Sequence, residues 1–382
     1  HGRIQGKYKN GEYDRAPVSG RDLTLSIDLD IQAYGELLMH NNVGSIIMIE
    51  PKTGEILCMI SAPNYDPSLL TGRDFGKNYQ SLEKNPYKPL INRAVAGTYP
   101  PVSTFKPAQG VIFLQEGIIT EQTQYVCYHG YPPLGGKPAC HGHASPLAIQ
   151  YALATSCNSF FCYGLNAMLS NRTKYSDVNN AFDHWKDHMV DMGFGYKLGV
   201  DLPSEKRGFI PNSKFYTNIF KNSRWNAHNI ISTAIGQGEI LTTPLQIANF
   251  AAMTANRGSF YTPHVVKERK GAPLDTAFTN RRNSEIAREY FEIIVNGMAD
   301  AVTKGTCYGA NLAPEIQVCG KTGTAQNPHG EDHSLFMGFA PKDDPQVAIV
   351  VIVENGRFGA TNAVPIGRLM LQKFFKGNSR DR

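Results

Sequence analysis

A serine and a lysine three residues apart, Ser103 and Lys106, are the residues with the clearest chemical potential. They follow two prolines and open an apolar segment, which we expect to be a helix over residues 104–115 with Ser103 capping its start. Residues i and i+3 share one helical face, so the hydroxyl and the amine would point into the same space. A serine becomes a nucleophile when a base lies within hydrogen-bond reach, and this pair therefore indicates acyl transfer.

Lys106 can act as that base only if its pKa falls well below the usual value of about 10.4. Lowering the pKa to about 7.5 requires roughly 4 kcal/mol, and a helix N-terminus supplies at most about 2 kcal/mol against a cation. We therefore expect Lys106 to be buried beside a second cation.

A second motif, Ser156-Cys-Asn158, is the only Ser-x-Asn in the chain. It interrupts a helix that we expect over residues 146–165. Both polar side chains can reach one cavity, where Ser156 could relay a proton and Asn158 could bind a substrate amide. The alternative interpretation is a polar helix interruption without a catalytic role.

A third motif, Lys321-Thr322-Gly323-Thr324, lies in an expected strand. The lysine and the threonines can bind a substrate carboxylate, and Gly323 lets a ligand backbone approach closely. The backbone N–H groups of Ser103 and Thr324 could form an oxyanion hole.

The first motif, Ser-x-x-Lys, and the Lys-Thr-Gly part of the third each occur a second time in the chain. Ser81 and Lys84 repeat the serine–lysine spacing in a polar stretch, where we expect a solvated segment. Lys52-Thr-Gly54 repeats the third motif in an expected hairpin turn. We assign no catalytic role to either copy.

Composition excludes few functions. The chain has 382 residues, 41% of them hydrophobic, and a net charge of +5 that suits an anionic partner such as a membrane surface or cell-wall polymer. Nucleic-acid-binding motifs are missing from the sequence, so we expect no nucleic-acid partner. No apolar run approaches the ~18 residues that a membrane span needs. The N-terminal residue is His1, and we expect the chain to be part of a longer protein.

Hydrophobic periodicity predicts a sheet built from both ends of the chain around a helical middle. Asp28 is expected to cap the first helix. The predicted strands cover residues 23–28, 44–50, 55–61, 317–326, 335–340 and 347–354. The predicted helices cover residues 29–40, 104–115, 146–165, 178–192, part of 230–256, 286–303 and 366–375.

The three motifs, in this order, resemble those of the penicillin-binding protein transpeptidases of bacterial cell-wall synthesis. Within that family the chain is most similar to the class B, elongation-type penicillin-binding protein 2 group, from about residue 23 to the end. The further matching segments are Arg93-Ala-Val-Ala-Gly-Thr-Tyr-Pro-Pro, Gly236-Gln-Gly with Thr243-Pro-Leu-Gln246, and Gly320-Lys-Thr-Gly-Thr-Ala-Gln326.

The resemblance implies an α+β fold of the penicillin-binding protein/serine β-lactamase type, with an antiparallel five-stranded sheet flanked by helices and an all-helical subregion. It also implies a serine D,D-transpeptidase that cross-links peptidoglycan stem peptides and is acylated by β-lactams. Ser103 would attack the D-Ala–D-Ala bond, Lys106 would activate it, and Lys321 would keep the pKa of Lys106 near neutral. Ser156 and Asn158 would complete the catalytic set. The substrate carboxylate would be held by Thr322, Gly323 and Thr324.

The resemblance further implies a domain plan and a location. Residues 1–43 would form a linker and the end of a pedestal domain, residues 44–378 the transpeptidase domain, and residues 379–382 a tail. The protein would be anchored in the inner membrane with its catalytic domain in the periplasm. It would contact a glycosyltransferase and elongation-complex proteins through an N-terminal region outside this sequence.

Cysteine usage suggests a metal, although the chemistry itself needs no cofactor. The seven cysteines cannot all pair within one chain, and Cys58 and Cys319 are expected to be core residues of strands. The others include a cluster that suits a structural zinc ion, with His141 as the alternative to His143. Its members are Cys127, Cys140, His143 and Cys157. A disulfide or free thiols are the other interpretations.

The chain departs from the family at Val102, where a small residue, usually glycine, is expected before the nucleophile. A β-branched side chain there is expected to crowd the active-site mouth. Two other functions remain open: a serine β-lactamase or β-lactam sensor, which shares the three motifs, and a non-catalytic scaffold.

Overall fold

The computed structural model describes residues 7–221 and 224–378. The predicted tail, residues 379–382, and the first six residues of the predicted linker lie outside the described residues. None of the helices within these ranges combines the length and apolar character needed to cross a membrane.

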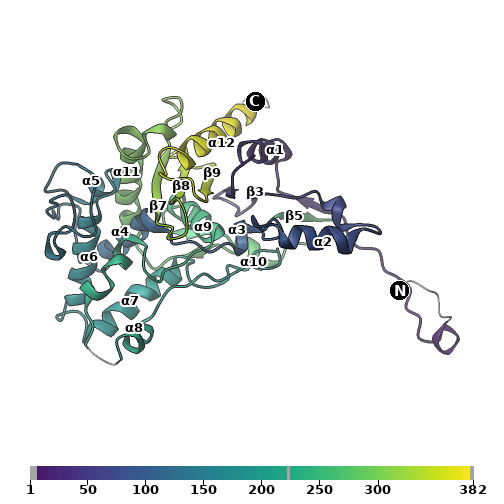
Figure 1. Ribbon diagram of the computed structural model, residues 1–382, viewed down its shortest axis with the longest axis horizontal. Coiled ribbons are helices and arrows are strands. Elements are labelled where there is room, and N and C mark those ends of the chain that lie inside the picture. The colour runs from purple at the N-terminus through teal and green to yellow at the C-terminus, as the bar shows by residue number, and fades with distance from the viewer. Residues whose placement is uncertain (1–6, 222–223, 379–382) are drawn as a thin grey trace.

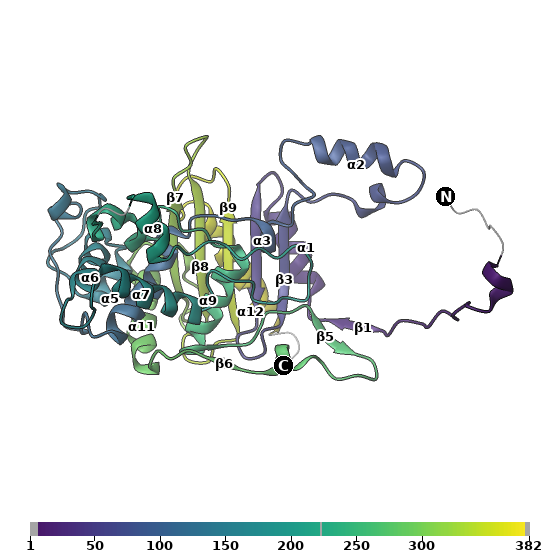
Figure 2. The same cartoon turned by 90° about the horizontal axis from the view of Figure 1, so that it is seen from below.

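A five-stranded antiparallel sheet forms the centre of the fold, in the order β3-β2-β9-β8-β7 (Figures 1 and 2). The sheet therefore joins strands from both ends of the chain, as the sequence predicts. All seven residues of β9 are buried, as expected for a central strand. The strand bounds are β2 Gly44–Ile49, β3 Ile56–Ala62, β7 Cys319–Ala325, β8 His333–Ala340 and β9 Val347–Val353.

Helices cover both faces of this sheet. Alternate residues of a strand point to opposite sides, so a strand with apolar residues at every position needs packing partners on both. Ile46 and Met48 of β2 pack with α1 (Leu29–Leu38) and α12 (Ala363–Asn378), whereas Ile47 packs on the face that α9 covers. Figure 1 shows α1 and α12 above the sheet and α9 (Pro244–Ala255) below it. Helix α11 (Arg288–Lys304) packs against β7, the edge strand of the sheet.

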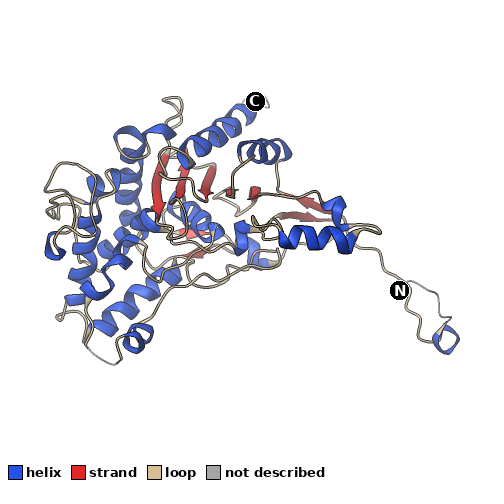
Figure 3. Cartoon of the chain, in the orientation of Figure 1, coloured by secondary structure: helices blue, strands red, loops and turns tan. Residues whose placement is uncertain are grey.

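A helical region lies beyond the β7 edge (Figure 3). Its helices are α4 Lys106–Gln115, α5 Ile149–Ala154, α6 Asn158–Ser170, α7 Val178–Asp191 and α8 Ser213–Ile219. The predicted break at residues 156–158 is confirmed, since α5 and α6 meet there. The predicted start of α5 at residue 146 is wrong, because Leu147 is extended and pairs with Tyr125. The closing helix is longer at both ends than predicted.

Helix starts agree with the capping chemistry in the sequence. The Asp28 side chain accepts the backbone N–H of Ile31, which confirms the predicted cap of α1. Thr243 and Gln246 form a reciprocal capping box at α9, where Pro244 occupies the first helical position.

Two parts project from this body on the β3 side, and the N-terminal segment of residues 7–22 extends beyond them (Figure 2). One is the arm of residues 63–92, which contains α2 (Phe75–Lys84). The other is the ribbon of β1 (Leu23–Leu25) and β5 (Val266–Arg269), so the predicted first strand does not join the main sheet. The remaining elements are α3 Arg93–Ala96, α10 Thr276–Thr279, β4 Ser259–Phe260, β6 Arg282–Asn283, and 3₁₀ turns at Tyr8–Gly11, Pro67–Leu70, Val102–Phe105, Pro132–Leu134, Ala227–Ile235 and Tyr308–Ala310.

The C-terminal end of α4 is tied to α7 by Glu116. Its carboxylate lies 2.7 Å from Lys174 Nζ and 2.6 Å from His188 Nε2, and it accepts a hydrogen bond from the Tyr175 hydroxyl. The hydrogen bonds from Lys174, Tyr175 and His188 outweigh the opposing effect of burial and lower the pKa of Glu116 to about 2. This cluster fixes the far end of the helix that begins with Lys106.

Glu116→Gln is therefore expected to lower the free energy of unfolding at pH 7 by about 1–3 kcal/mol. A lowered carboxyl pKa stabilises the fold above the unfolded pKa, and this contribution is lost as the pH falls from about 4.5 to about 2. Thermal unfolding measured between pH 7 and pH 3.5 should show the difference between wild type and variant shrinking toward acid. Glu121→Gln, at an exposed loop position, is the control. A difference that stays constant across this range would contradict the assignment.

Candidate active site

The segment that carries Ser103 is a 3₁₀ turn, Val102–Phe105, which leads directly into α4. The prediction that Ser103 caps this helix is wrong: Phe105 is the N-cap residue and makes no side-chain cap. The turn replaces the cap, because Thr104 N–H bonds to the Pro101 carbonyl and Lys106 N–H to the Ser103 carbonyl. No hydrogen bond of the Ser103 hydroxyl occurs among the described residues, so this half-buried group is available to a ligand.

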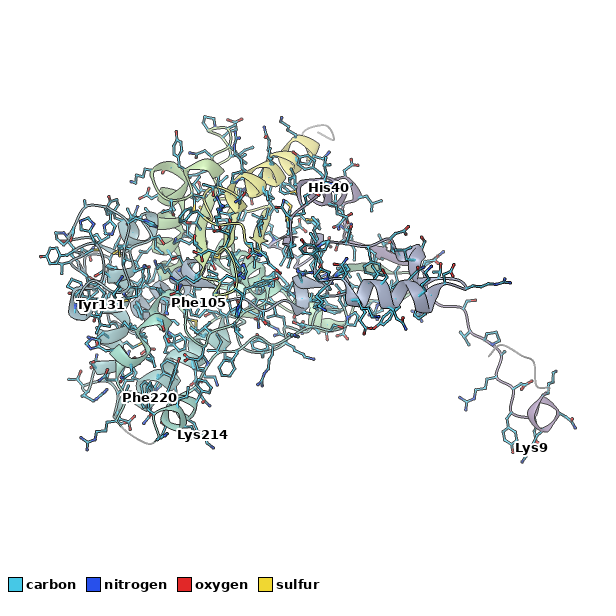
Figure 4. The ribbon with its side chains drawn as sticks, in the orientation of Figure 1. Lys9, His40, Phe105, Tyr131, Lys214 and Phe220 are labelled. Carbon is cyan, nitrogen blue, oxygen red and sulfur yellow. The ribbon has the colours of Figure 1, made fainter. Side chains whose placement is uncertain are left out.

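Phe105 anchors this turn in the core. Its side chain is 1% exposed and packs edge-on against Trp185 of α7 and against Phe194. In Figure 4 it lies in the middle of the molecule, between the sheet and the helical region. The segment that carries Ser103 is thus anchored in the core by aromatic packing.

Lys106 is fully buried and its amine points to the Ser156 motif. Its Nζ lies 2.7 Å from the Ser156 carbonyl oxygen, 2.6 Å from Asn158 Oδ1 and 3.1 Å from Ser156 Oγ. Burial lowers the pKa of Lys106 to about 8. The Ser156 carbonyl oxygen and Asn158 Oδ1 can only accept hydrogen bonds. When the Lys106 amine is neutral, its two N–H groups satisfy both acceptors. Its lone pair is then free to take a hydroxyl proton.

Lys321 reaches the same serine from β7. Its fully buried Nζ lies 2.8 Å from Ser156 Oγ and 3.2 Å from the Thr322 carbonyl oxygen. Burial, and then the positive charge of Lys106, lower the pKa of Lys321 to about 7. A second amine therefore lies beside Lys106 as the sequence predicts, but burial rather than the charge of Lys321 lowers the pKa of Lys106.

Ser156 sits at the junction of α5 and α6 in a left-handed conformation, with φ = 57°. Its neighbour Asn158 begins α6, where Oδ1 faces Lys106 and Nδ2 donates to the Ala139 carbonyl at 2.6 Å. One N–H of this amide is therefore committed inside the protein, and one remains for a ligand.

The β7 segment forms the opposite wall of the site. The Thr322 hydroxyl donates to Thr306 Oγ1 at 3.0 Å, and Thr324 Oγ1 accepts the Gly359 N–H at 3.3 Å. At Gly323 a Cβ atom would lie 2.7 Å from a Val102 methyl group, so glycine is required there.

A cleft of about 650 Å³ joins these residues. It brings together six of the predicted residues: Ser103, Ser156, Asn158, Thr322, Gly323 and Thr324. It also contains residues that sequence reasoning missed, namely Gln237, Thr306, Phe358 and Gly359. Of these four residues, only Gln237 had a signal in the sequence, since it lies in the matching segment Gly236-Gln-Gly. The other three come from loops whose positions depend on contacts with distant parts of the chain.

The repeated copies of the motifs lie elsewhere. Lys52 occupies a turn and pairs with Asp344, both largely exposed. Ser81 and Lys84 are exposed on α2 of the projecting arm. Neither copy contributes to the cleft.

Val102 lines the cleft, but its side chain is only 2% exposed and lies against Gly323, so it adds little bulk to the opening. The backbone of Val102 is strained, because its φ is 46°, a left-handed value that is rare for β-branched residues.

The predicted cysteine–histidine cluster is assembled. One ligand atom from each of Cys127, Cys140, His143 and Cys157 lies within 4.8 Å of the other three. His141 is not part of this group and lines the active-site cleft instead. All seven cysteines are free thiols, and Cys58 and Cys319 are buried in strands as predicted.

The His143 ring is oriented for a ligand. Its Nδ1 lies 2.9 Å from the Ala144 carbonyl oxygen, which fixes the proton on that nitrogen. Its Nε2 is buried and has no hydrogen-bond partner among the described residues. Three sulfur atoms and one orphaned imidazole nitrogen fit a tetrahedral zinc ion.

Comparison with known proteins identifies the same architecture. Residues 44–372 match the penicillin binding protein transpeptidase domain family. The chain is 36% identical to the peptidoglycan D,D-transpeptidase MrdA of Acinetobacter baumannii, over 91% of this chain and 53% of that protein. It therefore spans about half the length of the curated relative that it matches.

Two of the solved structures that are similar to this chain are structures of PBP2. The first is Pseudomonas aeruginosa PBP2 in complex with WCK 5153, with a TM-score of 0.82 and 30% identity, covering 94% of this chain and 79% of that one. The second is Helicobacter pylori PBP2 in complex with MreC, with a TM-score of 0.76 and 26% identity, covering 93% and 64%. These neighbours confirm the predicted fold class.

Lys321→Met is expected to raise the free energy of unfolding at pH 7 by about 1–3 kcal/mol. A lysine whose pKa is lowered by burial gives up its proton on folding, which destabilises the fold until the pH approaches the unfolded value of about 10.5. Urea unfolding between pH 7 and pH 10 should therefore show the gap between variant and wild type closing as the pH rises. Lys52→Met, at an exposed turn, should change little at any pH. A gap that widens with pH would refute this account.

Proposed function

The chain belongs to the penicillin-binding protein transpeptidase family, and on that premise we propose that it is a serine D,D-transpeptidase that cross-links peptidoglycan stem peptides. The observation that carries the proposal is the convergence of two fully buried amines, from Lys106 and Lys321, on the hydroxyl of Ser156 in the cleft that contains Ser103. A β-lactamase or sensor has no comparable support, since the matched family is the transpeptidase.

In the proposed first step, Ser103 Oγ attacks the carbonyl carbon between the two terminal D-Ala residues, and neutral Lys106 takes the hydroxyl proton. The proton passes through Ser156 to the nitrogen of the leaving D-Ala, and the C–N bond breaks to leave an ester on Ser103. In the second step an amine of a neighbouring stem peptide attacks this ester. Its proton returns Ser103 to the hydroxyl form, and the new amide is the cross-link.

Lys321 has two tasks in this scheme. With Lys106 it forms a pair of buried amines that cannot both hold a proton, so one of the two remains available as a base near neutral pH. It also donates to Ser156 Oγ, which orients that hydroxyl toward Lys106. Thr322 and Thr324 line the cleft at the outer edge of β7. A substrate carboxylate would bind there, beside Gly323.

The N–H groups of Ser103 and Thr324 would bind the oxygen that becomes negatively charged in both steps. β-Lactams would acylate Ser103 by the same attack, with the lactam C–N bond breaking in place of the peptide bond.

We propose that the cysteine–histidine cluster holds a structural zinc ion. Cys127, Cys140, His143 and Cys157 would fill all four positions of a tetrahedron, which leaves none for catalysis. The ion would brace the Ser156 motif, because Cys157 lies within it and Cys140 Sγ accepts the Asn158 N–H at 3.1 Å. The transpeptidase steps need no cofactor.

The wider setting is also a proposal. Residues 44–378 would be the catalytic unit and the residues before them a linker to a pedestal, in a protein held at the inner membrane with this unit in the periplasm. The relative from H. pylori forms a complex with MreC, and we propose elongation-complex proteins of this kind, with a glycosyltransferase, as partners of the whole protein.

Intact-protein mass spectrometry after exposure to a labelled penicillin tests the proposed chemistry. We expect one adduct that persists for many minutes, because a transpeptidase passes the acyl group to an amine and hydrolyses it only slowly. Ser103→Ala should show no adduct, and Ser81→Ala, at the repeated motif on α2, should behave as wild type. An adduct that clears within seconds would indicate a β-lactamase, and an adduct that survives Ser103→Ala would identify another nucleophile.

Metal analysis of protein purified without chelator tests the zinc proposal. We expect about one zinc ion per chain, a large loss of metal in Cys140→Ser, and a lower unfolding temperature after chelator treatment. Cys58→Ala removes a buried cysteine outside the cluster and should keep the metal. A content well below one zinc per chain would end the proposal.

A further inference from the structure

Tyr99 precedes Ser103 by four residues and is held by both its backbone and its side chain. Its N–H donates to the Thr242 carbonyl, and its own carbonyl accepts the Thr242 N–H, each at 2.9 Å. The ring is 6% exposed, and the hydroxyl donates to Glu354 Oε1 at 2.8 Å. The chain that enters the nucleophile turn is thus fixed at one residue on two sides.

The carboxylate that receives Tyr99 is fixed in turn. Glu354 directly follows the central strand β9, and its N–H donates to the Val43 carbonyl at 2.7 Å. Its Oε1 also accepts Arg93 Nε at 2.9 Å. Arg93 is 6% exposed, and its other nitrogens donate to the Tyr87 and Lys88 carbonyls at the base of the arm. A planar guanidinium with three fixed acceptors holds one orientation.

The segment between Tyr99 and Ser103 needs such an anchor because it contains a strained residue. Val102 has φ = 46°, and conformations of this kind persist only where the surroundings hold them in place. After Val102 the chain is held by Lys106, and Val102 itself donates its N–H to the Gly236 carbonyl at 2.9 Å. Before it, the Thr104 hydroxyl donates to the Pro101 carbonyl at 2.5 Å within the turn, and the hydrogen bond from Tyr99 to Glu354 ties the segment to the end of β9.

We propose that Tyr99 and Glu354 are positioning residues for the nucleophile: their hydrogen bond holds Val102 in its left-handed conformation and thereby places the Ser103 hydroxyl. This inference rests on the proposed acylation of Ser103. Neither side chain lines the active-site cleft, so both act through the backbone of the turn rather than on the substrate.

Tyr99→Phe is the informative variant, because the ring has its own support. It packs edge-on against the His333 ring at 6.0 Å between centroids, and His333 Nδ1 accepts the Asn355 N–H at 3.1 Å. Phenylalanine keeps this packing and loses only the hydroxyl. We expect the second-order rate of acylation by a labelled penicillin to fall about tenfold, the effect of losing one hydrogen bond to a charged acceptor.

A double-mutant cycle with Val102→Gly separates positioning from general weakening. Glycine adopts a positive φ without strain, so in the Val102→Gly background the loss of the Tyr99 hydroxyl should lower the acylation rate by less than about twofold. Glu354→Gln retains an oxygen acceptor for Tyr99 and should acylate faster than Glu354→Ala, which retains none. Tyr175→Phe is the matched control, since it removes a tyrosine–glutamate hydrogen bond at the opposite end of α4. It should leave the acylation rate unchanged, because Lys174 and His188 still hold Glu116 and with it the end of α4.

The outcomes distinguish this inference from the proposed function. If wild type forms an adduct on Ser103 and Tyr99→Phe acylates at the same rate, the positioning role is wrong while the function stands. Equal effects of Tyr99→Phe in the wild-type and Val102→Gly backgrounds would also overturn it. If wild type forms no adduct on Ser103, the proposed function falls and this inference with it. Unfolding temperatures measured for every variant identify any whose rate falls because the fold is lost, and the glutamate series then decides.

Discussion

The burial of two amines around one hydroxyl is the constraint on which the rest of the site depends. Lys106 and Lys321 are both fully buried, and among the described residues their hydrogen-bond partners are neutral oxygens. Two charged amines cannot share such a volume without a large desolvation and repulsion penalty, so one of them gives up its proton. In the proposed chemistry, a weakly nucleophilic serine thereby gains a base without a histidine or a carboxylate. The fold bears the penalty because each amine is carried on a rigid element, α4 or β7.

That rigidity comes from attachments at both ends of each element. The start of α4 is held by Phe105 in the aromatic core, and its end by the Glu116 cluster. On the other side, β7 pairs along its length with β8, which leaves its outer edge open toward the cleft. The junction of α5 and α6 lies between them and is tied to the cysteine–histidine cluster through Cys140. The first two motifs therefore lie at the ends of helices and the third within a paired strand, rather than in mobile loops.

The sequence predicted the parts of this site that depend on local rules. Asp28 shows the cap of α1, β9 shows its central place by being apolar on both faces, and the spacing of the motifs predicts residues that meet in the cleft. Ser103 was misjudged as a cap because a 3₁₀ turn and a helical turn have nearly the same local pattern. The choice between His141 and His143 could not be made from spacing, since a loop decides which ring faces the sulfur atoms. Glu354 and Tyr99 are 255 residues apart, and no local rule connects them.

The antiparallel pairing of β2 with β9 sets the order in which this protein can form. These strands are about 300 residues apart in the chain, so their contact is among the slowest to close. During synthesis the hairpin of β2 and β3 must wait with an open, apolar edge until the last strands emerge, a state prone to association with other chains. Glu354 arrives with the same late strand. The order of assembly thus leaves the turn that carries Ser103 without the Tyr99–Glu354 hydrogen bond until residue 354 has been made.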